Sequence, residues 1–336
     1  MNRNALKYLI AIVLTAGALY LAFRGQDFSV IFESIKHANV FALLGIVAFQ
    51  LMAHFIRAWR WQFLLRPVKP KIGLYNSFKA VVAAYGLNNV VPRAGELVRP
   101  AMIASSEKIP FSSALATIVL ERILDVIALG TVLVTSLFLF QKEFAVSFPD
   151  IASKSLPVIV AIAAGLAVFV LVLVNKTVER WMFSLIRKLL PKKIGGKIIG
   201  LLETFIAGLH GLSKDTILPI ITGTVGVWVF YLLSTFAGTF VLPGSGIEHV
   251  GFDGAISLLA LTGISITIPT PGGTGTYHYF ISRALNGFFA IPLPAAIAFA
   301  TITHAVNYIA ITLLGVFYML RAGVSLGAAQ TKEYGK

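Results

Sequence analysis

Cysteine is absent from the 336-residue sequence. This absence excludes disulfides, Cys-ligated zinc, iron–sulfur clusters and thiol catalysis. The sequence also contains no Walker loop, no Rossmann glycine fingerprint and no His-Glu-x-x-His pair. The longest stretch between apolar runs is about 40 residues, too short for an ordinary catalytic domain. We therefore expect no cofactor, no bound metal, no catalytic residue and no nucleotide-driven pump in this chain, although an enzymatic activity stays open.

Charged residues are scarce, at 12% of the sequence, whereas hydrophobic residues make up 57%. A soluble domain carries about 25% charged residues. The apolar residues come in runs of about 20, the length of a helix that crosses a hydrocarbon core of about 30 Å. Because backbone groups cannot stay unpaired in lipid, these runs must be helical. The sequence predicts an all-α, polytopic membrane protein, with residues 1–336 forming a single integral membrane domain.

Six apolar runs are long enough to cross the membrane completely. They cover residues 5–23, 40–64, 113–140, 156–175, 217–243 and 293–320. Two others, near 75–105 and 253–290, are interrupted by proline and glycine. A lipid-facing helix does not tolerate such a break, but a re-entrant hairpin buried among helices does. We predict six full spans and two opposed re-entrant or broken-helix hairpins.

The basic residues predict the orientation. With the N-terminus in the cytoplasm and each hairpin returning to its own side, twenty of the 28 basic residues are cytoplasmic and four are external. Arg57 and Arg60 are counted among the cytoplasmic residues. Because the positive-inside rule expects this excess, we predict a cell-membrane protein with both termini in the cytoplasm. The run 5–23 resembles a signal peptide, but without a clear cleavage site we interpret it as a retained helix.

Residues 176–214 alternate Arg and Lys with apolar side chains such as Trp181 and Phe183. This pattern predicts a cytoplasmic amphipathic connector on anionic lipid, with a specific partner-binding site as the alternative. The net charge of +14 is therefore assigned to the membrane, and no nucleic acid is expected. The oligomeric state is open, with a homo-oligomer among the alternatives.

The first broken segment places charges where a membrane makes them costly. Arg93, Glu96 and Arg99 stand between apolar flanks, beside the helix breaker Pro92 and the turn-forming Gly95. Each charge at mid-membrane costs at least about 2.5 kcal/mol on insertion scales. We therefore expect these side chains to be paired or to face a wet cavity.

Two acidic residues of the third predicted span form a second candidate group. Glu121 and Asp125 are one helical turn apart and share one face. Neighbouring carboxylates in a low dielectric repel unless a cation or a proton relieves them, and Arg93 and Arg99 are the predicted partners. Arg122 lies about 100° round the helix and is expected to face a neighbour or the interface. A structural ion-pair network and a substrate or proton pathway are both open.

The second broken segment contains Pro271, Gly272, Gly273 and Gly275, which cannot continue a helix. They can expose backbone N–H groups at the start of a new helix, a geometry that binds phosphate. A tight turn without a ligand is the alternative. Further candidates are His278, Arg283, His304 and Asn307, although a satisfied buried histidine is the ordinary interpretation of the two histidines.

The predicted topology brings one hairpin from the cytoplasm and the other from outside. Opposed broken helices that meet near the midplane are a recurrent transporter architecture. The sequence similarity between the two segments is too weak to establish a duplication.

Three ordered motifs resemble one family. They are Pro92-Arg93-Ala94-Gly95-Glu96-x-x-Arg99, Glu121-Arg122-x-x-Asp125 and Pro271-Gly272-Gly273-x-Gly275. Together they resemble the lysylphosphatidylglycerol synthase transmembrane-region family, described as flippase-like, over about residues 5–325. The resemblance implies a stand-alone member, because the cytosolic aminoacyltransferase domain of the best-known members has no counterpart here. His278 stands where the family often has an acidic residue, which puts a lysyl-lipid substrate in doubt.

The resemblance implies translocation of a phospholipid or a polyprenyl-phosphate-linked lipid between leaflets. In this hypothesis Arg93 and Arg99 hold the lipid phosphate, and Glu96, Glu121 and Asp125 balance them, meet a cationic head group or relay a proton. A membrane glycosyltransferase that uses Glu121 and Asp125 as base or metal ligands is one alternative. A non-catalytic scaffold is the other.

Overall fold

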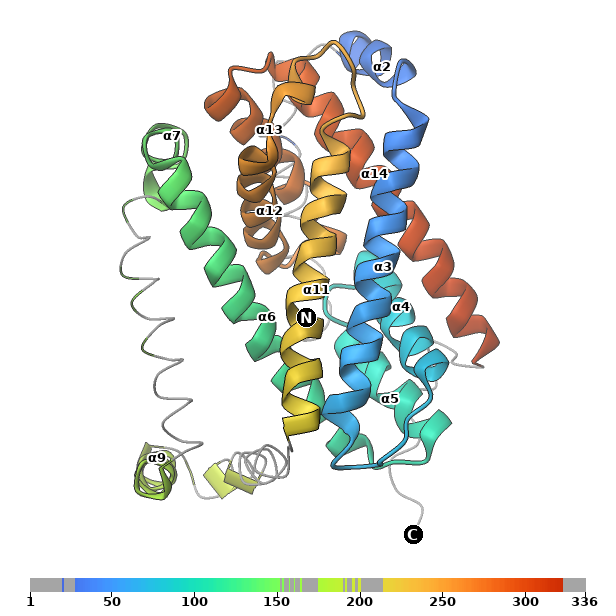
Figure 1. Ribbon diagram of the computed structural model, residues 1–336, viewed down its shortest axis with the longest axis vertical. Coiled ribbons are helices and arrows are strands. Elements are labelled where there is room, and N and C mark those ends of the chain that lie inside the picture. Colours follow the sequence, from blue (N-terminus) through green and yellow to red (C-terminus); the bar gives the residue numbers. More distant parts are fainter. Residues whose placement is uncertain are drawn as a thin grey trace, which may run out of the picture.

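The computed structural model describes residues 20, 28–151, 153, 157, 160, 164, 175–189, 191, 195, 196, 199, 200 and 214–322. Within them the chain is helical and contains no strand (Figure 1). In chain order the elements are α2 (Phe28–Lys36), α3 (Val40–Leu65), α4 (Leu74–Val90), α5 (Gly95–Glu107), α6 (Phe111–Leu139), α7 (Gln141–Ser147), α9 (Lys176–Leu189), α11 (Lys214–Gly238), η1 (Ile247–His249), α12 (Phe252–Thr267), η2 (Pro271–Gly273), α13 (Thr276–Phe289) and α14 (Leu293–Arg321). The predicted fold of a helical membrane protein is confirmed.

Within the described residues, four helices are long and apolar enough to cross a membrane. They are α3, α6, α11 and α14, and they match four of the six predicted spans. The predicted spans 5–23 and 156–175 lie almost entirely outside the described residues. Large apolar side chains point outward from these helices, such as Phe41, Phe138 and Leu320. An outward apolar surface of this extent fits lipid rather than water as the solvent.

Both broken segments form helical hairpins that enter from opposite ends of the molecule. Figure 1 shows α4 and α5 in the half that contains α9, and α12 and α13 in the half that contains α2 and α7. The tips of the hairpins meet on α14. The Tyr308 hydroxyl donates to the Asn89 carbonyl at 2.8 Å, and a Cβ on Gly272 would lie 2.8 Å from the Tyr308 ring. The predicted opposed arrangement is therefore present.

The first hairpin turns because its residues allow two helices to approach closely. A Cβ on Gly95 would stand 2.1 Å from the Ala84 carbonyl oxygen, so any larger residue would push α5 away from α4. The Asn88 side chain accepts a hydrogen bond from the Gly95 N–H at 2.7 Å and closes the turn. At the base, Glu107 accepts hydrogen bonds from Lys69 and Asn76. Against the effect of burial, these bonds hold the pKa of Glu107 below its ordinary value.

The second hairpin turns through three glycines in the left-handed region. Gly272, Gly273 and Gly275 have φ values of 57°, 78° and 85°, which side chains with a Cβ rarely adopt. The Thr276 hydroxyl donates to the Ser265 carbonyl at 3.0 Å across the hairpin. The new helix α13 therefore starts where the glycines end, as predicted.

Small residues allow the first hairpin to pack closely on α14. A Cβ on Gly86 would lie 2.9 Å from the Gly315 Cα atom, so the two backbones touch at this crossing. Glycine at both positions is the usual means by which membrane helices come this close. The contact fixes the depth of α4 against α14.

The predicted amphipathic connector contains a helix, α9. Phe183 is buried in a small cluster with Leu120 and Ile123 of α6, whereas Trp181 and Leu189 are exposed. The helix therefore has one apolar face on the protein and a second, exposed apolar stripe beside its basic residues.

Candidate functional site

A cluster of buried charges joins α3, α5 and α6. Glu121 is fully buried, and its carboxylate accepts two hydrogen bonds from Arg99, from Nη1 at 2.5 Å and from Nη2 at 2.8 Å. Arg57 Nη1 donates to the same carboxylate at 2.8 Å. Arg60 lies 3.6 Å from the second oxygen. Both oxygens of Glu121 are therefore occupied by guanidinium groups.

Asp125 occupies the next turn of α6 and shares two of these arginines. Its carboxylate accepts from Arg57 Nη1 at 2.5 Å and from Arg60 Nη2 at 3.2 Å. Arg60 also donates to the Thr224 hydroxyl of α11 at 2.8 Å. The one-turn spacing of the two acids thus aligns with the one-turn spacing of the two arginines on α3.

Aromatic rings enclose the cluster on its apolar side. The guanidinium of Arg99 lies 3.9 Å from the Trp61 ring centre, and that of Arg57 lies 5.5 Å from the Tyr85 ring centre. Such stacking stabilises a cation that has left water. Removal of one partner from a buried charge network costs about 3–5 kcal/mol. The cluster therefore ties α5 of the first hairpin to α3 and α6.

A second pair extends the cluster toward open space. Arg122 Nε lies 3.8 Å from Glu96, and both side chains are about two-fifths exposed. Arg93 is exposed at the hairpin tip, with a φ of 63° in the left-handed region. The buried cluster, this second pair and Arg93 together form the site, and its net charge is positive. It contains five arginines (Arg57, Arg60, Arg93, Arg99 and Arg122) and three carboxylates (Glu96, Glu121 and Asp125).

A cavity of about 480 Å³ lies beside the cluster, between the tips of the two hairpins. This volume is in the usual range of small-ligand sites. Its walls come from α3, α4, α5, α6, α11, α12, α13 and α14 and from both hairpin tips. Its charged lining residues are Arg57, Arg93, Glu96, Arg122 and Asp125. The cavity thus combines the open side of the charge cluster with Gly272 and Gly273 of the second tip.

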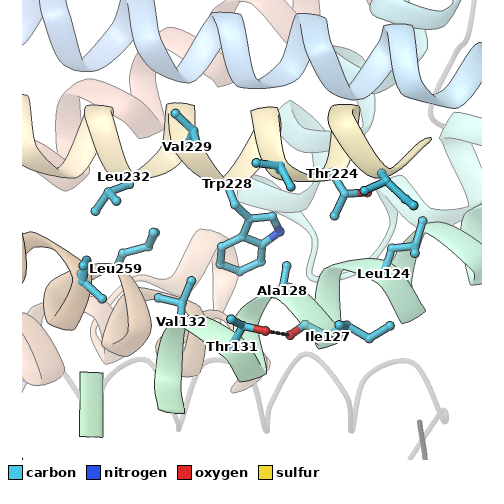
Figure 2. A pocket seen from close by; sticks show the side chains of 13 residues that line it. Leu124, Ile127, Ala128, Thr131, Val132, Thr224, Trp228, Val229, Leu232 and Leu259 are labelled. Atoms are coloured by element: carbon cyan, nitrogen blue, oxygen red, sulfur yellow. Dashed lines mark hydrogen bonds between the residues drawn. The ribbon is translucent and has the colours of Figure 1, made fainter. Parts of the chain in front are cut away.

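A second, apolar groove of about 440 Å³ lies between α6, α11 and α12. Figure 2 shows Trp228 of α11 projecting into it above Ala128 of α6. Leu124, Val132 and Val229 are among the other lining residues. Trp228 and Leu259 line both the groove and the polar cavity. The two spaces therefore adjoin at these side chains.

The predicted site residues fall into three groups. Arg99, Glu121 and Asp125 form the buried cluster. Arg93, Glu96, Asp125, Gly272 and Gly273 line the cavity. Pro271, Gly275, His278 and Arg283 are not among the described lining residues of the cavity.

The predicted pairing of the two acids with Arg93 needs correction. The acids pair with Arg57, Arg60 and Arg99 rather than with Arg93, because the tip directs Arg93 outward. Arg283 is also exposed, and its Nε donates to the Ser147 carbonyl at 3.4 Å, beside α7.

His278 lies in the first turn of α13. It is buried, and its Nδ1 accepts from the Gly275 N–H at 3.4 Å, at the start of α13. The backbone N–H of Gly275 is thereby occupied by a side chain of the same turn. His304 does line the cavity, and its Nε2 lies 3.2 Å from the Thr274 hydroxyl.

Sequence reasoning missed the contribution of α3. Arg57 and Arg60 had been counted as cytoplasmic, but both are buried in the cluster. His54 and Arg57 line the cavity from the same helix. The available signal was the spacing of His54, Arg57 and Arg60, three residues apart in an apolar run, which places all three near one face.

Comparisons with known proteins agree with the resemblance. The family model of the lysylphosphatidylglycerol synthase TM region matches residues 8–315. The UPF0104 membrane protein MJ1595 of Methanocaldococcus jannaschii is 25% identical over 293 residues, which cover 82% of this chain and 83% of that protein. No solved structure shows significant similarity to the chain. The chain therefore belongs to the lysylphosphatidylglycerol synthase TM-region family of multi-pass membrane proteins.

Proposed function

We propose that this protein moves a phosphate-bearing lipid between the two leaflets of the cell membrane. The observation that carries the proposal is the excess of arginine over carboxylate at a cavity between two opposed hairpin tips. Guanidinium groups bind phosphate through charge-assisted, often bidentate hydrogen bonds. An intramembrane site of this charge suits an anionic group that must leave the lipid–water interface.

Arg93 is the best candidate for the first phosphate contact. It lines the cavity, is exposed, and is not one of the arginines that bind the buried acids. A left-handed φ is unfavourable for a residue with a Cβ, so a turn alone would be served better by glycine. By contrast, Arg99 is buried, paired with Glu121 and stacked on the Trp61 ring, so it holds Glu121 in place and does not contact the lipid.

The apolar groove suits the acyl chains of the same lipid. It lies between helices in the apolar part of the molecule and adjoins the polar cavity at Trp228. A lipid with its phosphate near Arg93 and Arg122 could place a chain in this groove without bringing the chain into water. Lipid passage would then need no nucleotide-binding domain.

The orientation that we propose places the α9 end in the cytoplasm. Described basic residues stand at helix ends there: Lys69 follows α3, Lys108 follows α5, Lys176 begins α9 and Arg321 ends α14. Figure 1 shows these ends of α3, α5 and α14 in the half that contains α9. The exposed stripe of α9 would lie on anionic lipid there. If Arg57 and Arg60 are removed from the twenty basic residues predicted to be cytoplasmic, these still far outnumber the four predicted to be external. The charge bias that predicted the orientation therefore persists.

The test is lipid exchange in liposomes that contain the purified protein and acyl-labelled fluorescent phosphatidylglycerol. Dithionite quenches only the outer leaflet, so loss of the protected fraction measures translocation. We expect Arg93→Gln to lower the exchange rate about tenfold, since a hydrogen bond to a charged group contributes about 1.5–3 kcal/mol. Arg93→Lys should retain part of the rate.

Arg66→Gln is the matched control, because Arg66 is exposed at the end of α3 and stacks on Phe63 outside the cavity. Exchange no faster than in protein-free liposomes would contradict the proposed function. Equal rates for wild type and Arg93→Gln would remove Arg93 from the pathway and favour the scaffold alternative for the charged tip.

A further inference from the structure

Several buried polar atoms at the cavity have no hydrogen-bond partner within the described part of the chain. The clearest case is His54, which is 0% exposed and whose two ring nitrogens are both unpaired. Its ring packs against the Tyr85 ring with the centroids 4.4 Å apart, and His54 is one of the residues that line the cavity. Buried polar groups are usually satisfied, and an unsatisfied one in a cavity points to a ligand.

Four further atoms share this property. Arg57 Nε, Arg122 Nε and Trp228 Nε1 are unpaired donors, and Asn307 Oδ1 is an unpaired acceptor. All four residues line the cavity, from α3, α6, α11 and α14. Donors therefore outnumber acceptors, and a ligand rich in oxygen atoms would satisfy them best.

The two buried carboxylates of the site are already engaged. Glu121 and Asp125 each accept hydrogen bonds from two arginines, whereas Glu96, about two-fifths exposed, makes only a 3.8 Å ion pair with Arg122. A cationic headgroup would have to compete with a guanidinium for each of them. An ammonium group, which only donates, would also leave the unpaired donors of the cavity unsatisfied.

We propose that the site selects a lipid whose headgroup carries hydroxyl groups and no positive charge, so that the negative phosphate is its only ionised group. This inference rests on the proposed function and names its substrate class: a glycerol- or sugar-type phospholipid, as opposed to an aminoacylated one. The phosphate contacts the arginines, and the hydroxyl groups bind His54, which can donate and accept, and Asn307 Oδ1. Trp228 Nε1, at the border with the apolar groove, binds an oxygen of the lipid backbone.

The experiment compares acyl-labelled lipids that differ only in the headgroup, in the liposome exchange assay. The probes are phosphatidylglycerol and phosphatidylinositol on one side, and phosphatidylethanolamine and lysylphosphatidylglycerol on the other. We expect the first pair to exchange about tenfold faster. Phosphatidylethanolamine offers no hydroxyl group to a site built to bind one, and lysylphosphatidylglycerol, which keeps one glycerol hydroxyl, adds ammonium groups that must compete with the arginines for the buried carboxylates.

Variants identify the atoms responsible. His54→Phe keeps the ring packing and should reduce the rate ratio of phosphatidylglycerol to phosphatidylethanolamine about tenfold, whereas His54→Gln should retain most of it. Asn307→Leu should act in the same direction. Ser257→Ala is the matched control, because Ser257 is also buried with an unpaired hydroxyl but is not among the described residues that line the cavity.

The outcomes separate this inference from the proposed function. Equal exchange of all headgroups, or faster exchange of lysylphosphatidylglycerol, would overturn the selectivity and leave translocation standing. If no lipid exchanges, the proposed function fails. Native mass spectrometry of the purified protein with the same four lipids then decides the selectivity by retention alone, where equal retention overturns it.

Discussion

The two hairpins are closed by different kinds of bond. At the first tip, Arg99 and Glu121 form a buried ion pair between the hairpin and a full span, and α3 contributes Arg57 to the same carboxylate. At the second tip, residues 265–278 include no Asp, Glu, Lys or Arg, and the Thr276 hydroxyl shares its one proton between two carbonyls of its own hairpin, those of Ser265 and Gly273.

This difference indicates that the hairpins depend on their surroundings to different degrees. The first tip needs charges from three helices, and each buried charge becomes costly if its partner is lost. The second tip satisfies itself with neutral hydrogen bonds, each of which contributes about 1 kcal/mol. We expect the first hairpin to be the part of the molecule that is most sensitive to single substitutions.

The largest expected effect is that of Glu121→Gln. The change leaves Arg57, Arg60 and Arg99 buried with Asp125 as their remaining buried acid. We expect a loss of about 3–5 kcal/mol in the free energy of unfolding, measured by SDS titration in mixed micelles. Glu96→Gln is the control and should cost less than about 1 kcal/mol, because this exposed carboxylate lies 3.8 Å from Arg122. Equal losses in the two variants would show that burial does not distinguish the pairs.

A smaller loss should follow from Gly95→Ala at the same tip. The added Cβ would meet the Ala84 carbonyl oxygen at 2.1 Å, so α5 must move from α4. We expect a cost of about 2 kcal/mol or more, together with slower lipid exchange. For Gly196→Ala, whose Cβ would meet no atom of the described residues within 4 Å, stability should stay within about 0.5 kcal/mol of wild type. An unchanged unfolding curve for Gly95→Ala would mean that the hairpin can open without cost.

The smallest effect is expected at the second tip, from Thr276→Val. This change removes the hydroxyl that donates to Ser265 and keeps the volume of the side chain. We expect a loss of about 1 kcal/mol, the same at low and high salt, since no charge is involved. The Glu121→Gln loss measured in parallel gives the comparison. A Thr276→Val loss as large as that of Glu121→Gln would remove the distinction between the hairpins.

The sequence predicted the elements well because proline, glycine and apolar run length act locally. Four spans and both breaks occur where they were expected, and the turn at Gly272 follows from glycine's access to positive φ. Arg99, Glu121 and Asp125 were recognised because charges are rare in apolar runs. The partner assignment failed for Arg93, since the direction of a side chain at a hairpin tip is set by the turn and not by its neighbours in sequence.

The sequence by itself determined that this is a helical membrane protein with two broken segments and a set of intramembrane charges, because each of these properties depends on residues close together in the chain. Only the tertiary structure decided which charges pair and which face open space. The sequence predicted that Arg57 and Arg60 lie at the cytoplasmic face of the membrane. In the structure α3 packs beside α6 and buries both residues against Glu121 and Asp125. His54 likewise became a cavity residue only through the placement of Tyr85 and Tyr231. The pairings of Arg57 with Glu121 and of Arg60 with Asp125 join residues more than 60 positions apart, and packing between helices, rather than local pattern, brings them together.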